Sequence, residues 1–98
     1  MIIVTGTITA QSSTLARIRE LSLEHVHRSR TEPGCLLHSV HHDVEDPLTL
    51  VFIEHWENRA ALDAHFRVPE SGAFVNEAAA LSAAPPTIQI YDATPRSM

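Results

Sequence analysis

The sequence contains no lysine: all seven of its Lys and Arg residues are arginines, and 12 acidic residues give it a formal net charge of −5. This charge balance disfavours binding to the phosphates of a nucleic acid or to an anionic membrane. The sequence also has no apolar run approaching the roughly 18–20 residues that span a bilayer. We therefore expect small molecules or proteins as partners, with no nucleic acid and no membrane among them.

Cysteine is almost absent as well, and Cys35 stands alone. An internal disulfide framework is excluded, and the N-terminal "MIIVTGTITA" has no basic segment of the kind found in signal peptides, so the expected compartment is the cytoplasm. A chain of 98 residues forms one domain, here residues 1–98 with 93–98 as a loose tail. Its core is modest, so self-association adds useful burial.

Motifs that bind cofactors are missing too. There is no G-x-G-x-x-G or P-loop stretch, so nothing supports a nucleotide, flavin or nicotinamide cofactor. The sequence has seven histidines, but they form no H-E-x-x-H motif and no Cys/His quartet. From sequence we predict no cofactor and no metal site.

Four segments show the β-branched residues and two-residue alternation typical of strands. They are residues 2–10, 35–43, 48–56 and 87–92. Glu45-Asp46-Pro47 lies between the second and third, and proline presets the backbone angle that a tight turn requires. The two central strands are therefore predicted to form a hairpin.

Helical periodicity appears in the segments between the strands. The expected boundaries are Ser12 or Ser13 and Pro33-Gly34 for a long first helix, Asn58 and Phe66 for a short second one, and Pro69 and Pro85-Pro86 around a helical segment over 70–83. The resulting order, β-α-β-β-α-β, predicts the α+β, ferredoxin-like fold. In this fold a four-stranded antiparallel sheet carries both helical segments on one face.

Register in the central hairpin decides which side chains share a face. If the turn sets it, the even residues 48–56 share a face with Cys35, Leu37, Ser39 and His41, and the other face carries large apolar groups as well. The helices are expected to cover one face, and the other face is expected to meet a second subunit in a homodimer. The predicted interface residues are Val51, Ile53, His55, His38 and Val40, with dimer loosening toward pH 5 because His38 and His55 would repel when protonated.

The first helix has a polar centre on its buried side. At 100° per residue, Ile18, Ser22, His25 and Ser29 lie at the middle of the inward stripe. Buried hydroxyl and imidazole groups need partners, so this pattern indicates a cavity or polar ligand between helix and sheet. The alternative is that Ser22 bonds to a preceding carbonyl and His25 sits at an edge.

A second polar group lies at the corner between the third strand and the short helix. Glu54 and Trp56 share a strand face, and His65 points back toward the sheet from the helix. A Glu54–His65 pair beside an indole would orient a neutral imidazole for proton transfer near pH 7. The alternative is a structural hydrogen bond from His65 between helix and sheet, with Trp56 filling the core.

Laid out in this order, residues 32–66, "EPGCLLHSVHHDVEDPLTLVFIEHWENRAALDAHF", resemble the antibiotic biosynthesis monooxygenase family of dimeric α+β barrels. The resemblance extends from the first strand through "PTIQIYD". It is sharpest at Glu32-Pro33-Gly34-Cys35, Asp46-Pro47, Glu54-x-Trp56 and Ala61-Leu62-x-x-His65. It implies a homodimer whose sheets pack face to face, a C-terminal strand reaching toward the partner, and one pocket per subunit.

The resemblance also implies an activity: a cofactor-independent monooxygenase using O₂ on a small aromatic, quinol- or anthrone-like substrate. It assigns His65, Glu54 and Trp56 to catalysis. The candidate substrate-binding residues are Phe52, Leu37, Ser22, His25, Phe66 and Phe74. Phe52 stands where the anthrone oxygenases have an asparagine, and "ESGAFVNEAAAL" lacks the haem-binding histidine of the haem-degrading relatives. Two alternatives stay open. One is an isomerase or lyase using the same pocket for proton transfer, and the other is a non-catalytic dimeric module that binds a small ligand.

Overall fold

The computed structural model describes residues 1–97 and confirms the predicted element order. The elements are β1 (Ile2–Thr9), α1 (Leu15–Ser29), β2 (Cys35–His42), β3 (Thr49–Trp56), α2 (Arg59–Arg67), α3 (Pro69–Leu81) and β4 (Thr87–Asp92). Asn58 caps α2 as expected, because its side chain accepts a hydrogen bond from the backbone N–H of Ala61 at 2.9 Å. The predicted tail begins at Ala93, whose backbone pairs with Met1; Met98 lies outside the described residues.

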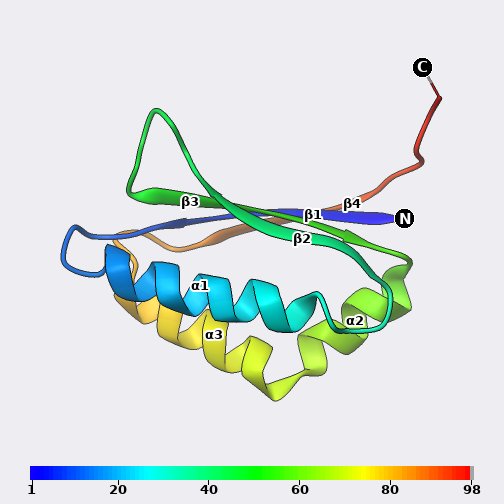
Figure 1. The fold of residues 1–98 in the computed structure, drawn as a ribbon, viewed down its shortest axis with the longest axis horizontal. Coiled ribbons are helices and arrows are strands. Elements are labelled where there is room, and N and C mark those ends of the chain that lie inside the picture. Colours follow the sequence, from blue (N-terminus) through cyan, green and yellow to red (C-terminus); the bar gives the residue numbers. More distant parts are fainter. Residues whose placement is uncertain (98) are drawn as a thin grey trace.

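The strands form one antiparallel sheet in the order β2-β3-β1-β4. All three helices lie against one face of it, with α1 and α3 side by side and α2 at the end of the sheet where β3 finishes (Figure 1). This is the predicted ferredoxin-like arrangement. The opposite face has no covering layer within the described chain (Figure 1).

Two apolar clusters hold the helices on the sheet. The larger joins Ile18 and Val26 of α1 to Leu50 and Phe52 of β3 and Ala78 of α3. The buried residues of the smaller cluster are Ile2, Val4, Trp56 and Leu62. Burying a side chain of this size stabilises a fold by roughly 1.5–3 kcal/mol, so these contacts fix the helices that carry the polar groups between the clusters.

The connections at the two ends of α1 differ in how well the sequence predicted them. Gly34 has φ 81°, a left-handed conformation that favours glycine, and an added Cβ would lie 2.5 Å from the Cβ of Ala61. The predicted Pro-Gly turn is therefore confirmed. The N-cap is Thr14, not Ser12 or Ser13. Its hydroxyl donates to the carbonyl of Leu81 at 2.8 Å and so ties the start of α1 to the end of α3.

The predicted register of β2 is wrong by one residue. An irregularity between Cys35 and Leu37 shifts the pairing so that His38 lies opposite Glu54. Residues opposite one another in an antiparallel pair share a face, so His38 points toward the helices and is only 1% exposed. Val40, opposite Phe52, likewise packs against the larger core cluster.

This shift changes the open face of the sheet. Its central part carries Val51, Ile53 and His55 with Leu37, all part-exposed or exposed. His38 and Val40 therefore do not belong to a dimer interface on that face, and the predicted repulsion between His38 and His55 has no structural basis. None of the helices within residues 1–97 has the length and apolarity needed to cross a membrane.

Candidate active site

A cavity of about 270 Å³ lies between the helices and the β1–β4 half of the sheet. Its walls are largely apolar, and its polar lining residues are His25, His65 and Glu54 together with Thr7 and Thr87. The apolar lining residues include Phe52, Phe66, Phe74, Val75 and Ile88. An apolar cavity with a few converging polar groups is the usual form of a small-molecule site.

His65, on the last turn of α2, is 3% exposed and is held in a fixed orientation. Its Nδ1 lies 2.7 Å from Oε1 of Glu32, in the loop between α1 and β2. A carboxylate can only accept a hydrogen bond, so Nδ1 of His65 carries the proton. The lone pair of the neutral ring is therefore on Nε2. The Trp56 ring packs against the imidazole, with centroids 4.6 Å apart.

Glu54 on β3 contacts three different side chains through one oxygen. Its Oε1 accepts a hydrogen bond from Trp56 Nε1 at 2.9 Å and lies 3.4 Å from His38 Nε2 and 4.0 Å from His65 Nε2. Burial alone would raise the pKa of this carboxyl group, but the contacts with His38, Trp56 and His65 outweigh it and lower the pKa. Glu54 is therefore an anion at neutral pH.

His25, on the inward side of α1, completes the polar group. Its Nδ1 accepts a hydrogen bond from Arg28 at 2.7 Å, and its ring stacks on Phe74 with centroids 4.2 Å apart. Burial lowers the pKa of His25 to about 3, with further lowering by His38, His65 and Arg28. The ring is therefore neutral across the physiological pH range.

The structure brings most of the predicted site residues together. His65, Glu54, His25, Phe52, Phe66 and Phe74 all line the one cavity. Trp56 is completely buried behind Glu54 and His65 and does not line it. The predicted Glu54–His65 pair is not a hydrogen bond, because the atoms are 4.0 Å apart and Glu32 binds His65 instead.

Two predicted binding residues lie elsewhere. Leu37 is on the open face of the sheet and 40% exposed, a consequence of the register shift in β2. Ser22 is buried as expected, but it lines a separate, smaller hollow beside Val40 and Leu50, and its hydroxyl has no hydrogen-bond partner in the described chain. Neither contacts the cavity that holds His65.

Sequence reasoning missed three residues of the site: Glu32, His38 and Arg28. Arg28 has a weak local signal, because it follows His25 by three residues on one helix face. His38 was missed through the register error. Glu32 meets His65 across 33 positions of sequence, and no local pattern indicates such a contact.

Comparison with known proteins gives the family of the chain. The family model described as "antibiotic biosynthesis monooxygenase" matches residues 1–77. An uncharacterized protein of Synechocystis sp. is 38% identical over 90 residues, covering 92% of this chain and 61% of its own length. This chain thus spans about three fifths of that curated relative.

Solved structures give the same result. A Deinococcus radiodurans protein whose structure is described under the name antibiotic biosynthesis monooxygenase is 28% identical to this chain. The two structures align with a TM-score of 0.94 over 100% of this chain and 97% of the other. A further structure, described as an antibiotic biosynthesis monooxygenase, is 32% identical, with a TM-score of 0.88 over 97% of this chain and 100% of its own. The protein has the ferredoxin-like fold of these neighbours, and the chain belongs to the antibiotic biosynthesis monooxygenase family.

Proposed function

We propose that the protein is a monooxygenase that oxidises a small, electron-rich aromatic compound with O₂ and requires no cofactor. The observation that carries this proposal is the position of His65: its Nδ1 is bound to Glu32 at 2.7 Å, and the residue lines an apolar cavity. A carboxylate-oriented imidazole at an apolar site is suited to removing a proton from a substrate. Family membership supports monooxygenation as the reaction class.

The proposed chemistry begins with transfer of a substrate proton to Nε2 of His65. The resulting anion gives one electron to O₂, and recombination of the two radicals forms a carbon–oxygen bond. The peroxide O–O bond then breaks. Overall the substrate loses two hydrogens and gains one oxygen atom, while the second oxygen leaves as water. The substrate supplies all the electrons, so the step needs no other reductant.

Cavity size supports a compact substrate. The volume of about 270 Å³ is just below the range of roughly 300–1,000 Å³ common for ligand pockets. A one- or two-ring quinol fits this space better than a three-ring anthrone. Phe52 and Phe74, whose ring centroids are 5.9 Å apart, offer aromatic surfaces against which such a ring can pack.

We also propose that the protein is a homodimer that pairs through the open face of its sheet. Val51, Ile53 and Leu37 on that face, together with Tyr91 of β4, remain part-exposed or exposed in the single chain. Contiguous apolar surface of this kind usually marks an interface. Pairing would leave the cavity on the helical side of each subunit.

Oxygen uptake with a panel of hydroquinones and anthrones, in buffer treated with a chelator, tests the proposed reaction. We expect uptake with one-ring or two-ring quinols and little with anthrones. Conversion of a bound compound to an isomer without oxygen uptake would instead indicate an isomerase or lyase. Binding of panel compounds without any conversion would indicate a ligand-binding module.

A further inference from the structure

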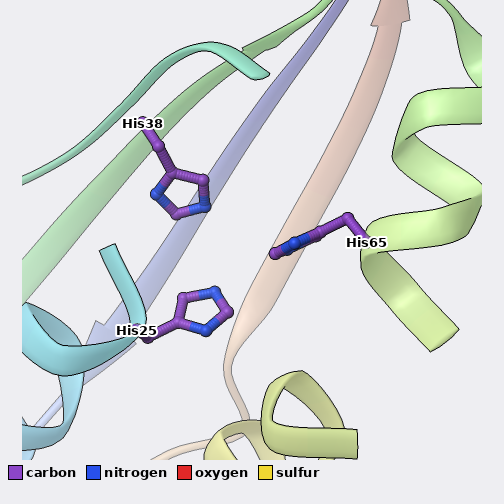
Figure 2. Close-up of side chains that lie close together, drawn as sticks. All are labelled: His25, His38 and His65. Carbon is purple, nitrogen blue, oxygen red and sulfur yellow. The ribbon is translucent and has the colours of Figure 1, made fainter. Parts of the chain in front are cut away.

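Three buried histidines from three different elements meet beside the cavity. They are His25 of α1, His38 of β2 and His65 of α2, and each offers a ring nitrogen within 4.8 Å of the others. Figure 2 shows the three rings directed toward a common space. We propose that this trio, with Glu54, binds a divalent transition-metal ion.

The spacing of the rings fits one ion. The ring centroids of His25, His38 and His65 are 5.2, 5.3 and 5.7 Å apart. With metal–nitrogen bonds of about 2.0–2.1 Å in tetrahedral geometry, three imidazoles on one ion have centroids about 5 Å apart and nitrogens about 3.4 Å apart. The nitrogens now lie within 4.8 Å of one another, so each pair must close by up to about 1.4 Å to reach this bonding arrangement.

His38 carries an independent indication of a ligand. It is 1% exposed, and neither ring nitrogen has a hydrogen-bond partner in the part of the chain that the structure describes. A buried polar group without a partner is destabilising. A bond from Nε2 to an ion would satisfy the nitrogen that points toward Glu54 and the other two rings.

Two carboxylates support the trio, Glu54 as a further ligand and Glu32 as the partner of His65. Glu54 Oε1 lies 3.4 Å from His38 Nε2 and 4.0 Å from His65 Nε2, so it is placed as a fourth ligand with negative charge. Glu32 accepts from His65 Nδ1 at 2.7 Å. Metal-binding histidines commonly donate their other N–H to a carboxylate, which directs the lone pair of Nε2 toward the ion.

Arg28 is the group that opposes binding. Its guanidinium donates to His25 Nδ1 at 2.7 Å, so Nε2 of the neutral ring carries the proton. For Nε2 to bind an ion, Arg28 must leave Nδ1. Glu32 Oε2 offers the new partner, because it and Arg28 Nε are buried, have no hydrogen-bond partner within residues 1–97 and are 4.0 Å apart.

Imidazole and carboxylate ligands together suit Zn²⁺, Co²⁺, Fe²⁺ or Cu²⁺ better than Mg²⁺ or Ca²⁺. The bound ion would occupy Nε2 of His65, the atom that the proposed oxygenase reaction uses as a base. The metal-bound and proton-transferring states are therefore mutually exclusive. Metal binding itself is measured without substrate, so its outcome is independent of the proposed reaction.

Titration of the metal-free protein with Co²⁺ and then Zn²⁺ tests the site. We expect one ion per chain, visible absorption bands of tetrahedral Co²⁺, and displacement of Co²⁺ by Zn²⁺. His38→Gln should weaken Zn²⁺ binding about 100-fold and Glu32→Gln about tenfold. His41→Gln is the matched control, because His41 is on the same strand but exposed on the open face, and it should leave the affinity unchanged.

Arg28→Met should change the Zn²⁺ affinity in the opposite direction. Removing a cation beside His25 should strengthen Zn²⁺ binding about tenfold. X-ray absorption of the Zn²⁺-loaded wild-type protein decides the matter even if a variant fails to fold, because the proposal requires three imidazoles on the ion. Equal affinities of the His38→Gln and His41→Gln proteins, no Co²⁺ bands, or a zinc shell without three imidazoles would each overturn the proposal.

Discussion

Nδ1 of His65 lies 2.7 Å from Oε1 of Glu32, and this contact joins α2 to the loop that follows α1. It fixes the tautomer of the histidine and leaves Nε2 as its basic nitrogen. The carboxylate also stabilises the imidazolium that forms when Nε2 takes a proton. Glu32 is thus a positioning residue in the proposed reaction.

Glu32→Gln tests this role. An amide keeps the hydrogen bond but removes the charge that favours the imidazolium. We expect turnover to fall roughly tenfold to a hundredfold, less than the 10²–10⁴-fold loss typical of removing a general base. The loss should fall on turnover with KM little changed, a split that a general loss of folded protein would not produce. Normal turnover in the folded variant would show that Glu32 does not act through His65.

Two substitutions at His65 separate folding from catalysis. His65→Ala removes a buried, hydrogen-bonded ring and should lower the free energy of unfolding by about 1–3 kcal/mol. His65→Gln retains an N–H donor of similar reach and should recover much of that loss. As an amide does not accept a proton near neutral pH, its turnover should fall by about 10²–10⁴-fold. A folded His65→Gln protein with wild-type turnover would exclude the proton-transfer role.

Acid should destabilise the protein through His25. Burial lowers its pKa to about 3, so below about pH 6.5 the unfolded chain binds a proton that the folded chain does not. Stability falls as pH falls, by about 1.4 kcal/mol per pH unit between those two pKa values. From pH 7.5 to pH 5.0 this amounts to about 2 kcal/mol.

Urea unfolding of the wild-type and His25→Gln proteins at both pH values isolates that contribution. The variant should lose about 2 kcal/mol less than the wild-type protein between the two conditions. Glu54 contributes little to the change in stability between pH 7.5 and pH 5.0. A carboxyl group with a lowered pKa loses its stabilising effect only below the ordinary pKa of about 4.5. Equal losses in both proteins would contradict the neutral, buried state of His25.

The proposed dimer is tested on the open face of the sheet. Light scattering at micromolar concentration should give twice the chain mass for the wild-type protein. Ile53→Arg places a charge at the centre of the interface and should give monomers. Val44→Arg, in the exposed β2–β3 loop, is the control and should remain dimeric. A monomeric wild-type protein would rule out this interface.

How far the sequence predicts this molecule depends on the range of each interaction. Local patterns identified every helix and strand, and the helical projection placed Ile18, Ser22, His25 and Ser29 on the buried side of α1, as found. The register of β2 depends on an irregularity near Leu36 that alternation does not reveal, so His38 was assigned to the wrong face and Leu37 to the cavity. The Glu32–His65 contact is set by tertiary packing alone.

Isotope labelling tests the central claim most directly. With ¹⁸O₂ and an accepted quinol, in chelator-treated buffer and quenched before carbonyl exchange, the proposed reaction puts one labelled oxygen atom into the product and the other into water. The same experiment with His65→Gln should give roughly 10²–10⁴-fold less labelled product in the same time. A product without label, or equal labelling by the variant, would contradict the account.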